Sequence, residues 1–119
     1  MTKERQHTGR TGEEIACDFL KKQGYSIVER NYRSRISEID IFAEHRKYLV
    51  FCEVKTRRNR IGLHPSFSVT AKKNEKLRML GEHYLSQKHL MHLKPRFDVI
   101  AVQLVGKTAP EIDHFVNTF

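Results

Sequence analysis

The sequence predicts an α/β domain in which a mixed β-sheet is flanked by helices. Two segments, residues 11–24 and 70–90, carry apolar residues at the 3.6-residue spacing of amphipathic helices. Between them lie three apolar segments with the composition of strands, and a fourth follows the second helix. The predicted element order is therefore α-β-β-β-α-β, with a short closing strand expected at residues 112–116. Such an order is typical of a central sheet covered by helices.

The length of 119 residues suits one domain with one hydrophobic core. We predict a flexible basic arm at residues 1–8 and a single domain at residues 9–119. No window approaches about 18 consecutive apolar residues, and residues 1–7 lack the apolar core of a signal peptide. We therefore expect a cytoplasmic protein that does not span a membrane. Cys17 and Cys52 lie in apolar patterns and are expected to be reduced thiols of the core.

The formal net charge of +8 points to a polyanionic partner. Nucleic acid ranks ahead of an anionic membrane surface as that partner.

The first helix is expected to begin at Thr11, which forms a capping-box pattern with Glu14, and to end at Gly24. Its apolar face comprises Ile15, Ala16, Cys17, Phe19 and Leu20. Glu13 lies at the edge of this face, and no capping role explains it. Two interpretations stay open for Glu13: an acid favoured by the helix dipole, or a carboxylate directed into a site.

A hairpin is expected to bring two acidic residues together. Residues 25–32, 38–43 and 48–55 form the first three predicted strands, and residues 44–47 are a polar connection. Because side chains alternate along a strand, Asp40 faces away from Ile39 and Ile41. Folding the chain back around residues 44–47 places Asp40 opposite residues 51–53, depending on the register.

Glu53 and Lys55 project from one face at the end of the third predicted strand. If Asp40 faces the same side, these three residues form one charged cluster. A strand that simply reaches solvent, with Glu53 and Lys55 as a surface pair, is the alternative. Charged groups at the end of a buried strand are costly without partners. Taken alone, the surface pair is at least as good an interpretation, and it is Asp40, Glu13 and the neighbouring arginines that favour a functional cluster.

Basic residues surround the predicted cluster. Arg57, Arg58 and Arg60 follow the third strand directly, and Arg33 and Arg35 form a basic turn. Since arginine offers bidentate donors to phosphate, we expect these residues to contact nucleic acid. A solvated basic loop is the alternative.

The second helix is expected to start at Thr70, a good N-cap, and to carry Lys73 one turn before Leu77. Most lysines so placed extend along the surface to solvent, but Lys73 is a candidate to point at the site. Residues 96–105 form a fourth strand that is apolar enough to be covered on both faces.

The predicted cluster has the chemistry of a metal-dependent hydrolytic site. Carboxylate oxygens suit Mg²⁺ or Mn²⁺, ions that also accept substrate phosphate oxygens. Asp40 and Glu53 would be direct ligands, and Glu13 a further ligand, direct or through water. Lys55 would orient the attacking water or stabilise the negative charge that develops on the phosphate.

An ordered series of motifs covers nearly the whole chain. It consists of Gly9-x-x-Gly12-Glu13-x-x-Ala16, Gly24-Tyr25, Asn31-Tyr32-Arg33, Glu38-Ile39-Asp40, Val50-Phe51-Cys52-Glu53-Val54-Lys55-Thr56-Arg57, Val69-Thr70 with Lys73, and Arg96-Phe97-Asp98-Val99. The series resembles the YraN family of small, largely uncharacterised bacterial proteins. Asp40 followed after twelve residues by Glu53-Val54-Lys55 resembles the PD-(D/E)XK nuclease motif in its Asp…Glu-X-Lys form. The helix bearing Glu13 is similar to that of archaeal Holliday-junction resolvases.

The resemblance implies a restriction-endonuclease-like core and metal-dependent DNA cleavage. Two positions depart from the family pattern. Ser37 precedes Glu38 where glycine is usual, and Gly81 stands where alanine is expected. Serine is compatible with position 37 unless the backbone φ is positive there.

The main hypothesis is a Mg²⁺-dependent DNA endonuclease, with selectivity for DNA structure as one form of that activity. The alternative is a nucleic-acid-binding accessory protein that keeps the fold but cuts little, and a basic protein-interaction module is a third hypothesis. Junction-cutting relatives act as dimers, so the resemblance makes a homodimer one expected assembly.

Overall fold

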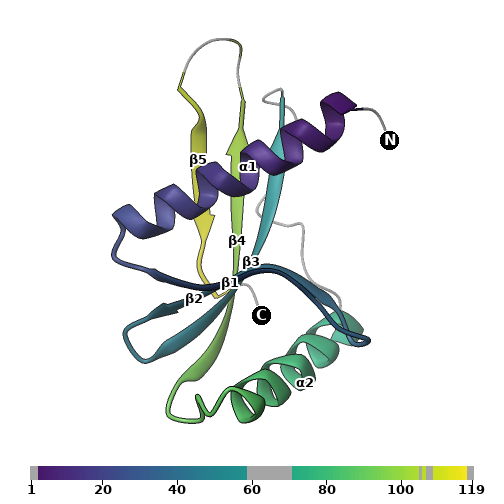
Figure 1. Ribbon diagram of the computed structural model, residues 1–119, viewed down its shortest axis with the longest axis vertical. Coiled ribbons are helices and arrows are strands. Elements are labelled where there is room, and N and C mark those ends of the chain that lie inside the picture. The colour runs from purple at the N-terminus through teal and green to yellow at the C-terminus, as the bar shows by residue number, and fades with distance from the viewer. Residues whose placement is uncertain (1–2, 59–70, 105, 107–108, 118–119) are drawn as a thin grey trace.

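The computed structural model describes residues 3–58, 71–104, 106 and 109–117, with the backbone alone described at residues 3–11 and 71–74. Two helices and five strands follow one another along the chain (Figure 1). They are α1 (Lys3–Lys22), β1 (Ser26–Arg33), β2 (Glu38–His45), β3 (Tyr48–Arg57), α2 (Ala71–Gln87), β4 (Lys94–Gln103) and β5 (Glu111–Phe115). The predicted α/β class and element order, including the closing strand, are confirmed.

The strands form one mixed sheet in the order β1-β2-β3-β4-β5. β1, β2 and β3 are joined antiparallel as successive hairpins, and β5 pairs antiparallel with β4. β3 and β4 pair in parallel over Tyr48↔Lys94 to Arg57↔Gln103, and the chain between them contains α2. Such parallel neighbours need a long crossover connection, for which a helix is the usual solution.

Each helix covers a different face of the sheet with its own hydrophobic core. On one face, Ala16, Cys17 and Leu20 of α1 pack with residues such as Val50, Cys52 and Ile100 of the sheet. On the other, Leu77, Leu80, Tyr84 and Leu85 of α2 pack with residues such as Phe42, Phe51, Phe97 and Val99. Successive side chains of β3 and β4 point to opposite faces, and both faces are covered, so each strand contributes side chains to both cores. Cys17 and Cys52 are buried free thiols, as the sequence predicts.

The start of α1 differs from the sequence prediction. The helix begins at Lys3, so Thr11 lies inside it rather than at an N-cap, and residues 3–8 of the predicted arm are helical. Residues 3–6 are mostly good helix formers, and none of the following residues is a proline, so nothing in the sequence forces a start at Thr11. The helix ends as predicted, with Gly24 at φ 90° and its N–H donating to the carbonyl of Lys21.

The two departures from the family pattern both fit the structure. Ser37 is not among the described residues with positive φ, and its N–H donates to Oγ of Ser34 at 3.2 Å in a tight turn. At Gly81 of α2, a Cβ atom would lie 2.7 Å from the ring of Phe51. Phe51 is fully buried, so the glycine provides the space that this ring occupies.

The sheet forks between β2 and β3. The β1–β2 ladder extends to Arg33↔Glu38, whereas the β2–β3 ladder ends at Ile41↔Cys52. Beyond that pair β1 and β2 curve away from β3 and β4 (Figure 1). Ile39 consequently packs in the α2-side core, whereas Ile41 packs in the α1-side core, so the prediction that they share a face is wrong. The fork leaves room at the ends of the separated strands for polar side chains.

None of the helices described here is long and apolar enough to cross a membrane.

Candidate active site

The carboxylate of Asp40 spans the fork. Continuing the register beyond Ile41↔Cys52 places Asp40 opposite Glu53, within the predicted range of residues 51–53. Because β2 and β3 no longer pair there, the N–H of Val54 donates to Oδ2 of Asp40 at 2.7 Å. Asp40 therefore holds the two separating strands together through a side chain, and its carboxylate lies beside Glu53.

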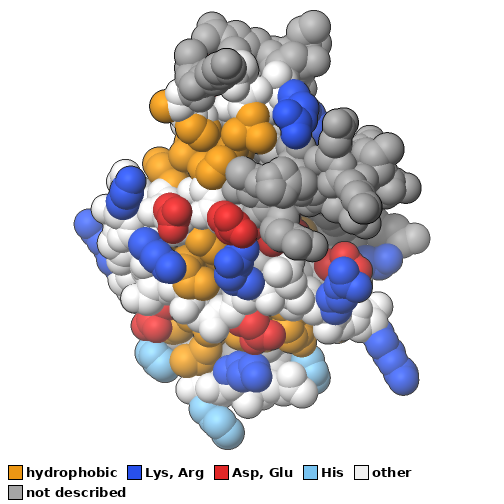
Figure 2. Space-filling view, turned by 45° about the horizontal axis from the view of Figure 1, so that its top comes forward, with side chains coloured by type: hydrophobic (Ala, Val, Ile, Leu, Met, Phe, Trp, Pro, Cys, Tyr) orange, Lys and Arg blue, Asp and Glu red, His pale blue; other side chains and the backbone are white. Residues whose placement is uncertain are grey.

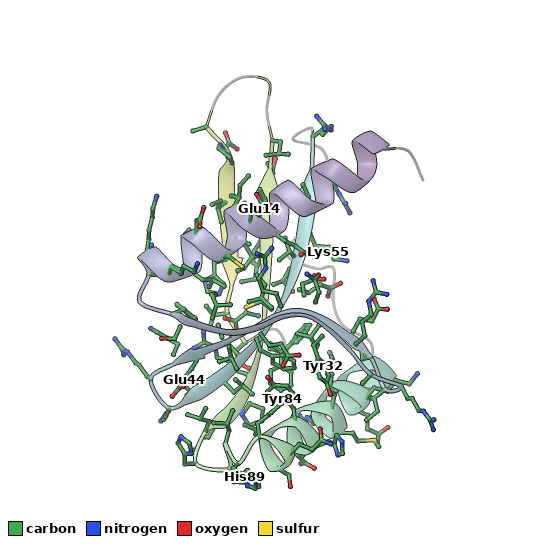
Figure 3. The ribbon with its side chains drawn as sticks, viewed as in Figure 1. Glu14, Tyr32, Glu44, Lys55, Tyr84 and His89 are labelled. Atoms are coloured by element: carbon green, nitrogen blue, oxygen red, sulfur yellow. The ribbon has the colours of Figure 1, made fainter. Side chains whose placement is uncertain are left out.

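Glu53 and Lys55 form an ion pair on β3. The distance from Nζ of Lys55 to Oε1 of Glu53 is 2.9 Å, and the two side chains are 25% and 33% exposed. The strand alternation places them on one face, as the sequence predicts. Lys55 lies on β3 just beyond the point at which β1 and β2 turn away (Figure 3). An ammonium group thus sits within reach of the acidic residues and of solvent.

Glu13 approaches the fork from α1. A Cβ atom at Gly12 would overlap Oγ1 of Thr56, so the absence of a side chain lets α1 lie directly against β3. The Glu13 side chain is 20% exposed, and its Oε2 lies 3.8 Å from Nη2 of Arg30. With the Asn31 amide oriented so that its nitrogen faces Glu13, that nitrogen donates to both carboxylate oxygens at 3.0 and 3.2 Å.

The acidic residues of the fork are in electrostatic contact with one another. Burial raises the pKa of Asp40, and the negative charge of Glu53 adds to the rise, while the Val54 N–H and Lys55 oppose it. Burial also raises the pKa of Glu13, and the charge of Asp40 adds to it, against Arg30 and Asn31. A cation placed among these carboxylates would relieve the repulsion between them.

Two hollows meet at Asp40. One, of about 360 Å³, is lined by Ser37, Glu38, Ile39, Asp40, Cys52, Glu53, Leu77 and Phe97. The other, of about 230 Å³, is lined by Glu13, Asn31, Tyr32, Arg33, Glu38, Ile39 and Asp40. Since both include residues 38–40 of β2, the strand end forms the ridge between them. Glu13 and Glu53 thus flank Asp40 on its two sides.

Among the described residues, no three histidine, cysteine, aspartate or glutamate side chains are grouped so as to hold a metal ion in their present positions. The acids instead meet protein donors: Val54 at Asp40, Lys55 at Glu53 and Asn31 at Glu13. The donor set is nevertheless carboxylate oxygen throughout, which suits a hard cation that keeps several waters. The residues present therefore fit Mg²⁺ or Mn²⁺ by chemistry, with side-chain adjustment on binding.

The predicted nucleic-acid-binding residues lie on exposed ends and turns. Arg33 is 3.9 Å from Glu38, Arg35 is exposed in the β1–β2 connection, and Arg57 and Arg58 are exposed at the end of β3. Arg60 lies outside the described residues, as does the side chain of Lys73. Figure 2 shows lysine and arginine side chains spread over the visible face with acidic ones among them.

A second charged cluster, which the sequence analysis did not identify, is buried on the α1 face. Asp98 of β4 is fully buried and accepts hydrogen bonds from Nε and Nη2 of Arg96 at 3.0 and 2.8 Å. Its Oδ2 lies 2.7 Å from Nε2 of His114 on β5, and its Oδ1 accepts from the N–H of Asn117 at 2.9 Å. Nη2 of Arg96 also donates to the Tyr25 hydroxyl at 2.7 Å. An acid within an apolar strand was the available signal for this cluster.

The Asp98 cluster lies on the opposite face of the sheet from Glu53, and its role is structural. Asp98 pairs with Cys52, whose side chain belongs to the α1-side core, whereas Glu53 is the next residue along β3 and faces the other way. Burial alone would raise the pKa of Asp98, but hydrogen bonds from His114, Arg96 and Asn117 outweigh it and lower that pKa below its usual value. The cluster joins β4 to β5 and to the end of α1.

Asn31 and the Val54 N–H are the other contacts that sequence reasoning missed. Asn31 was noted only within the motif Asn31-Tyr32-Arg33, and a backbone donor leaves no trace in the sequence.

Comparison with known proteins identifies similar chains. Residues 12–102 match the model of the uncharacterised protein family UPF0102. The chain is 43% identical over 119 residues to a UPF0102 protein of Syntrophotalea carbinolica, covering 100% of this chain and 96% of that protein. It is 44% identical over 115 residues to a UPF0102 protein of Pelobacter propionicus, covering 95% and 82%. A UPF0102 protein of Geobacter sulfurreducens, GSU0650, is 39% identical over 111 residues, covering 93% and 87%.

Proposed function

The chain belongs to the UPF0102 protein family, and from its site at the β2–β3 fork we propose that it is a Mg²⁺-dependent DNA endonuclease with a restriction-endonuclease-like core. The substrate is DNA and the reaction is hydrolysis of a phosphodiester bond. The cytoplasm, expected from the sequence, is the proposed working compartment. The homodimer that the family resemblance implies stays a prediction.

The observation that carries the proposal is the placement of Asp40 beside Glu53 with Lys55 on the same face. These three residues come from two strands, and the register brings them together at the place where the sheet opens. Chance pairing of a surface hairpin does not explain the half-buried position of Asp40 or its bond across the fork. The Asp…Glu-X-Lys spacing resembles the nuclease motif. In the folded chain this spacing corresponds to three side chains that lie near one another on adjacent strands.

Each residue of the fork has a part in the proposed reaction. Asp40 and Glu53, with Glu13 beside them, would hold the ion, which when bound would polarise the scissile phosphate and lower the pKa of a water. Lys55, now paired with Glu53, would place its ammonium against the negative charge that develops on the phosphate. Arg33 lines the same hollow as Glu13 and Asp40, and Arg35, Arg57 and Arg58 are exposed. These arginines bind the DNA backbone.

A second function has one specific observation in its favour. In the described part of the chain the acidic side chains are bonded to donors of the protein, and no three of them are arranged to hold a metal ion. An accessory protein that binds nucleic acid through its charge of +8, and cuts little, is consistent with that arrangement.

The test is cleavage of a panel of single-stranded, duplex, flap and four-way DNA with Mg²⁺, Mn²⁺ or EDTA. Metal-dependent cleavage should fall by on the order of 100-fold or more in Lys55→Ala, as for the loss of one charge-stabilising group. Asp40→Asn keeps an acceptor for the Val54 N–H but removes the charge, and it should abolish cleavage.

Glu44→Gln is the matched control, because Glu44 is a half-buried acid on the same strand, opposite Leu49 and away from the fork. It should cut like the wild type. Cleavage that survives in both Asp40→Asn and Lys55→Ala would assign the activity elsewhere. Salt-sensitive binding without cleavage of any substrate would favour the accessory function.

A further inference from the structure

Asn31 has an unusual backbone for a residue within a strand. Four non-glycine residues in the described part of the chain have positive φ: Asn31, Arg46, His89 and Asn117. Arg46 lies in the β2–β3 turn, and His89 and Asn117 follow α2 and β5, so Asn31 alone is inside a strand, with φ 54°. A left-handed backbone is unfavourable for an L-amino acid, less so for asparagine, and it persists where surrounding contacts select it.

The side chain of Asn31 contacts Glu13 of α1 from this backbone position. Its neighbours pair as Arg30↔Ile41 and Tyr32↔Ile39, so Asn31 stands opposite Asp40. From there its amide nitrogen reaches both oxygens of Glu13, on a different element, at 3.0 and 3.2 Å. Glu13, Asn31 and Asp40 line the same hollow. One residue of β1 therefore bonds the helix that carries Glu13, and it does so from the position opposite Asp40 on the neighbouring strand β2.

The contact is also directional. Arg30, at 3.8 Å from one oxygen of Glu13, supplies charge but no short hydrogen bond. The Asn31 amide meets both oxygens, which fixes the rotation of the carboxylate without bringing a second cation that would compete for the site.

We propose that Asn31 is a positioning residue that holds the Glu13 carboxylate toward Asp40, so that both acids can serve one divalent cation. The inference rests on the proposed metal-dependent function for its purpose, although the contact itself exists independently of that function. Partners of this kind, which orient a ligand without touching the metal, typically affect metal affinity by about 10–100-fold.

The contact is tested first without metal or DNA. The side-chain NH₂ signal of Asn31 in a ¹⁵N-labelled sample should be shifted downfield by the charged acceptor, and Glu13→Gln should remove the shift. The same signal unchanged in Glu13→Gln would overturn the inference, whatever the protein does to DNA.

The positioning role is tested with Asn31→Gly, which keeps the positive φ without strain and loses the amide. Asn117→Gly is the matched control, because Asn117 has φ 55° and bonds Asp98 only through its backbone N–H. In calorimetric titrations with Mn²⁺ alone, Asn31→Gly should bind on the order of 10-fold more weakly than the wild type, and Asn117→Gly equally well. DNA affinity in EDTA should be unchanged in both.

The outcomes separate the two proposals. Wild-type affinity for Mn²⁺ in Asn31→Gly would overturn the positioning role while leaving a DNA-cutting wild type intact. A wild type that neither binds Mn²⁺ nor cuts DNA would remove the proposed function, and the positioning role with it. A lower thermal midpoint in Asn31→Gly, with unchanged Mn²⁺ affinity, would assign Asn31 a purely structural task.

Discussion

At the scale of the single residue, the charge of Asp40 lowers the stability of the fold, whereas the proposed function requires that charge. Its pKa is raised, first by burial and then by the charge of Glu53, although the Val54 N–H and Lys55 oppose the rise. The folded protein therefore binds a proton at Asp40 more readily than the unfolded chain does. The charged form lowers the free energy of unfolding at neutral pH, and this penalty shrinks as the pH falls through the raised pKa and is gone below the ordinary pKa of an unfolded aspartate.

Asp40→Asn should consequently raise the thermal midpoint at pH 7 while abolishing cleavage. The amide oxygen still accepts the hydrogen bond from Val54, and the repulsion with Glu53 is gone. The advantage over the wild type should shrink as the pH is lowered, which thermal denaturation between pH 4 and 7 measures. A lower midpoint at pH 7 would contradict this account of Asp40.

A divalent cation should make the wild type more stable than Asp40→Asn. At a Mg²⁺ concentration about 100 times its dissociation constant, binding stabilises the wild type by about 2.7 kcal/mol. Asp40→Asn lacks one of the proposed ligands and should gain much less. Glu44→Gln serves again as control and should respond to Mg²⁺ like the wild type.

At the scale of the element, the approach of α1 to β3 depends on Gly12. A methyl group there would meet the side chain of Thr56, so the helix would have to move away from the strand or Thr56 would have to rotate. Gly12→Ala should therefore lower the free energy of unfolding, since overpacking costs about 1–3 kcal/mol and the better helix propensity of alanine offsets up to about 1 kcal/mol.

Chemical denaturation measures this loss, and the same variant should weaken cleavage because Glu13 moves with the helix. Thr56→Ala removes the Oγ1 atom that the added methyl group would meet. Stability that is recovered in the double variant, beyond the sum of the two single changes, identifies the contact as the cause. Strict additivity would mean that Gly12 acts in another way.

The pairing of β4 with β5 depends on the charge of Asp98. Because its folded pKa is depressed, Asp98 contributes stability that is fully present above its unfolded pKa of about 3.9 and is lost as the pH falls through the folded value. Asp98→Ala should cost about 3–5 kcal/mol, since Arg96 would be left as a buried charge without its partner.

Asp98→Asn should flatten the dependence of unfolding free energy on pH below about 4, where the wild type loses the contribution of the charge. Asp113→Asn is the control, because Asp113 is an exposed acid on the same strand β5. An equal slope in wild type and Asp98→Asn would show that other acids govern the acid limb.

At the scale of the whole molecule, the sequence predicted what repeats locally and missed what depends on contacts between distant elements. Alternation and the short polar connection were enough to place Asp40 opposite residues 51–53 and to put Glu53 and Lys55 on one face. The conformation of a residue that depends on a partner far away in the sequence could not be predicted from such patterns. Asn31 leaves the extended conformation at the point where its side chain meets Glu13 of α1, and no pattern within β1 predicts that contact.

The errors have the same origin. Ile39 was assigned to the wrong face because strict alternation assumes a continuous sheet, whereas β2 separates from β3 after Ile41. The start of α1 was misplaced because Thr11 and Glu14 match a capping box, and nothing local shows that the chain is already helical at Lys3.

The pairing of the strands also has a consequence for the order of folding. β2 and β3 join through a tight turn at residues 46–47, so Asp40 and Glu53 can meet within a local hairpin, on a timescale of about 1–10 μs. The parallel pairing Tyr48↔Lys94 closes a far longer stretch of chain and must wait for α2 to cross the sheet. We therefore expect the acidic pair to form early and to remain exposed until the sheet closes. Substitutions in the hairpin should then change the folding rate, and those at the Asp98 cluster mainly the unfolding rate.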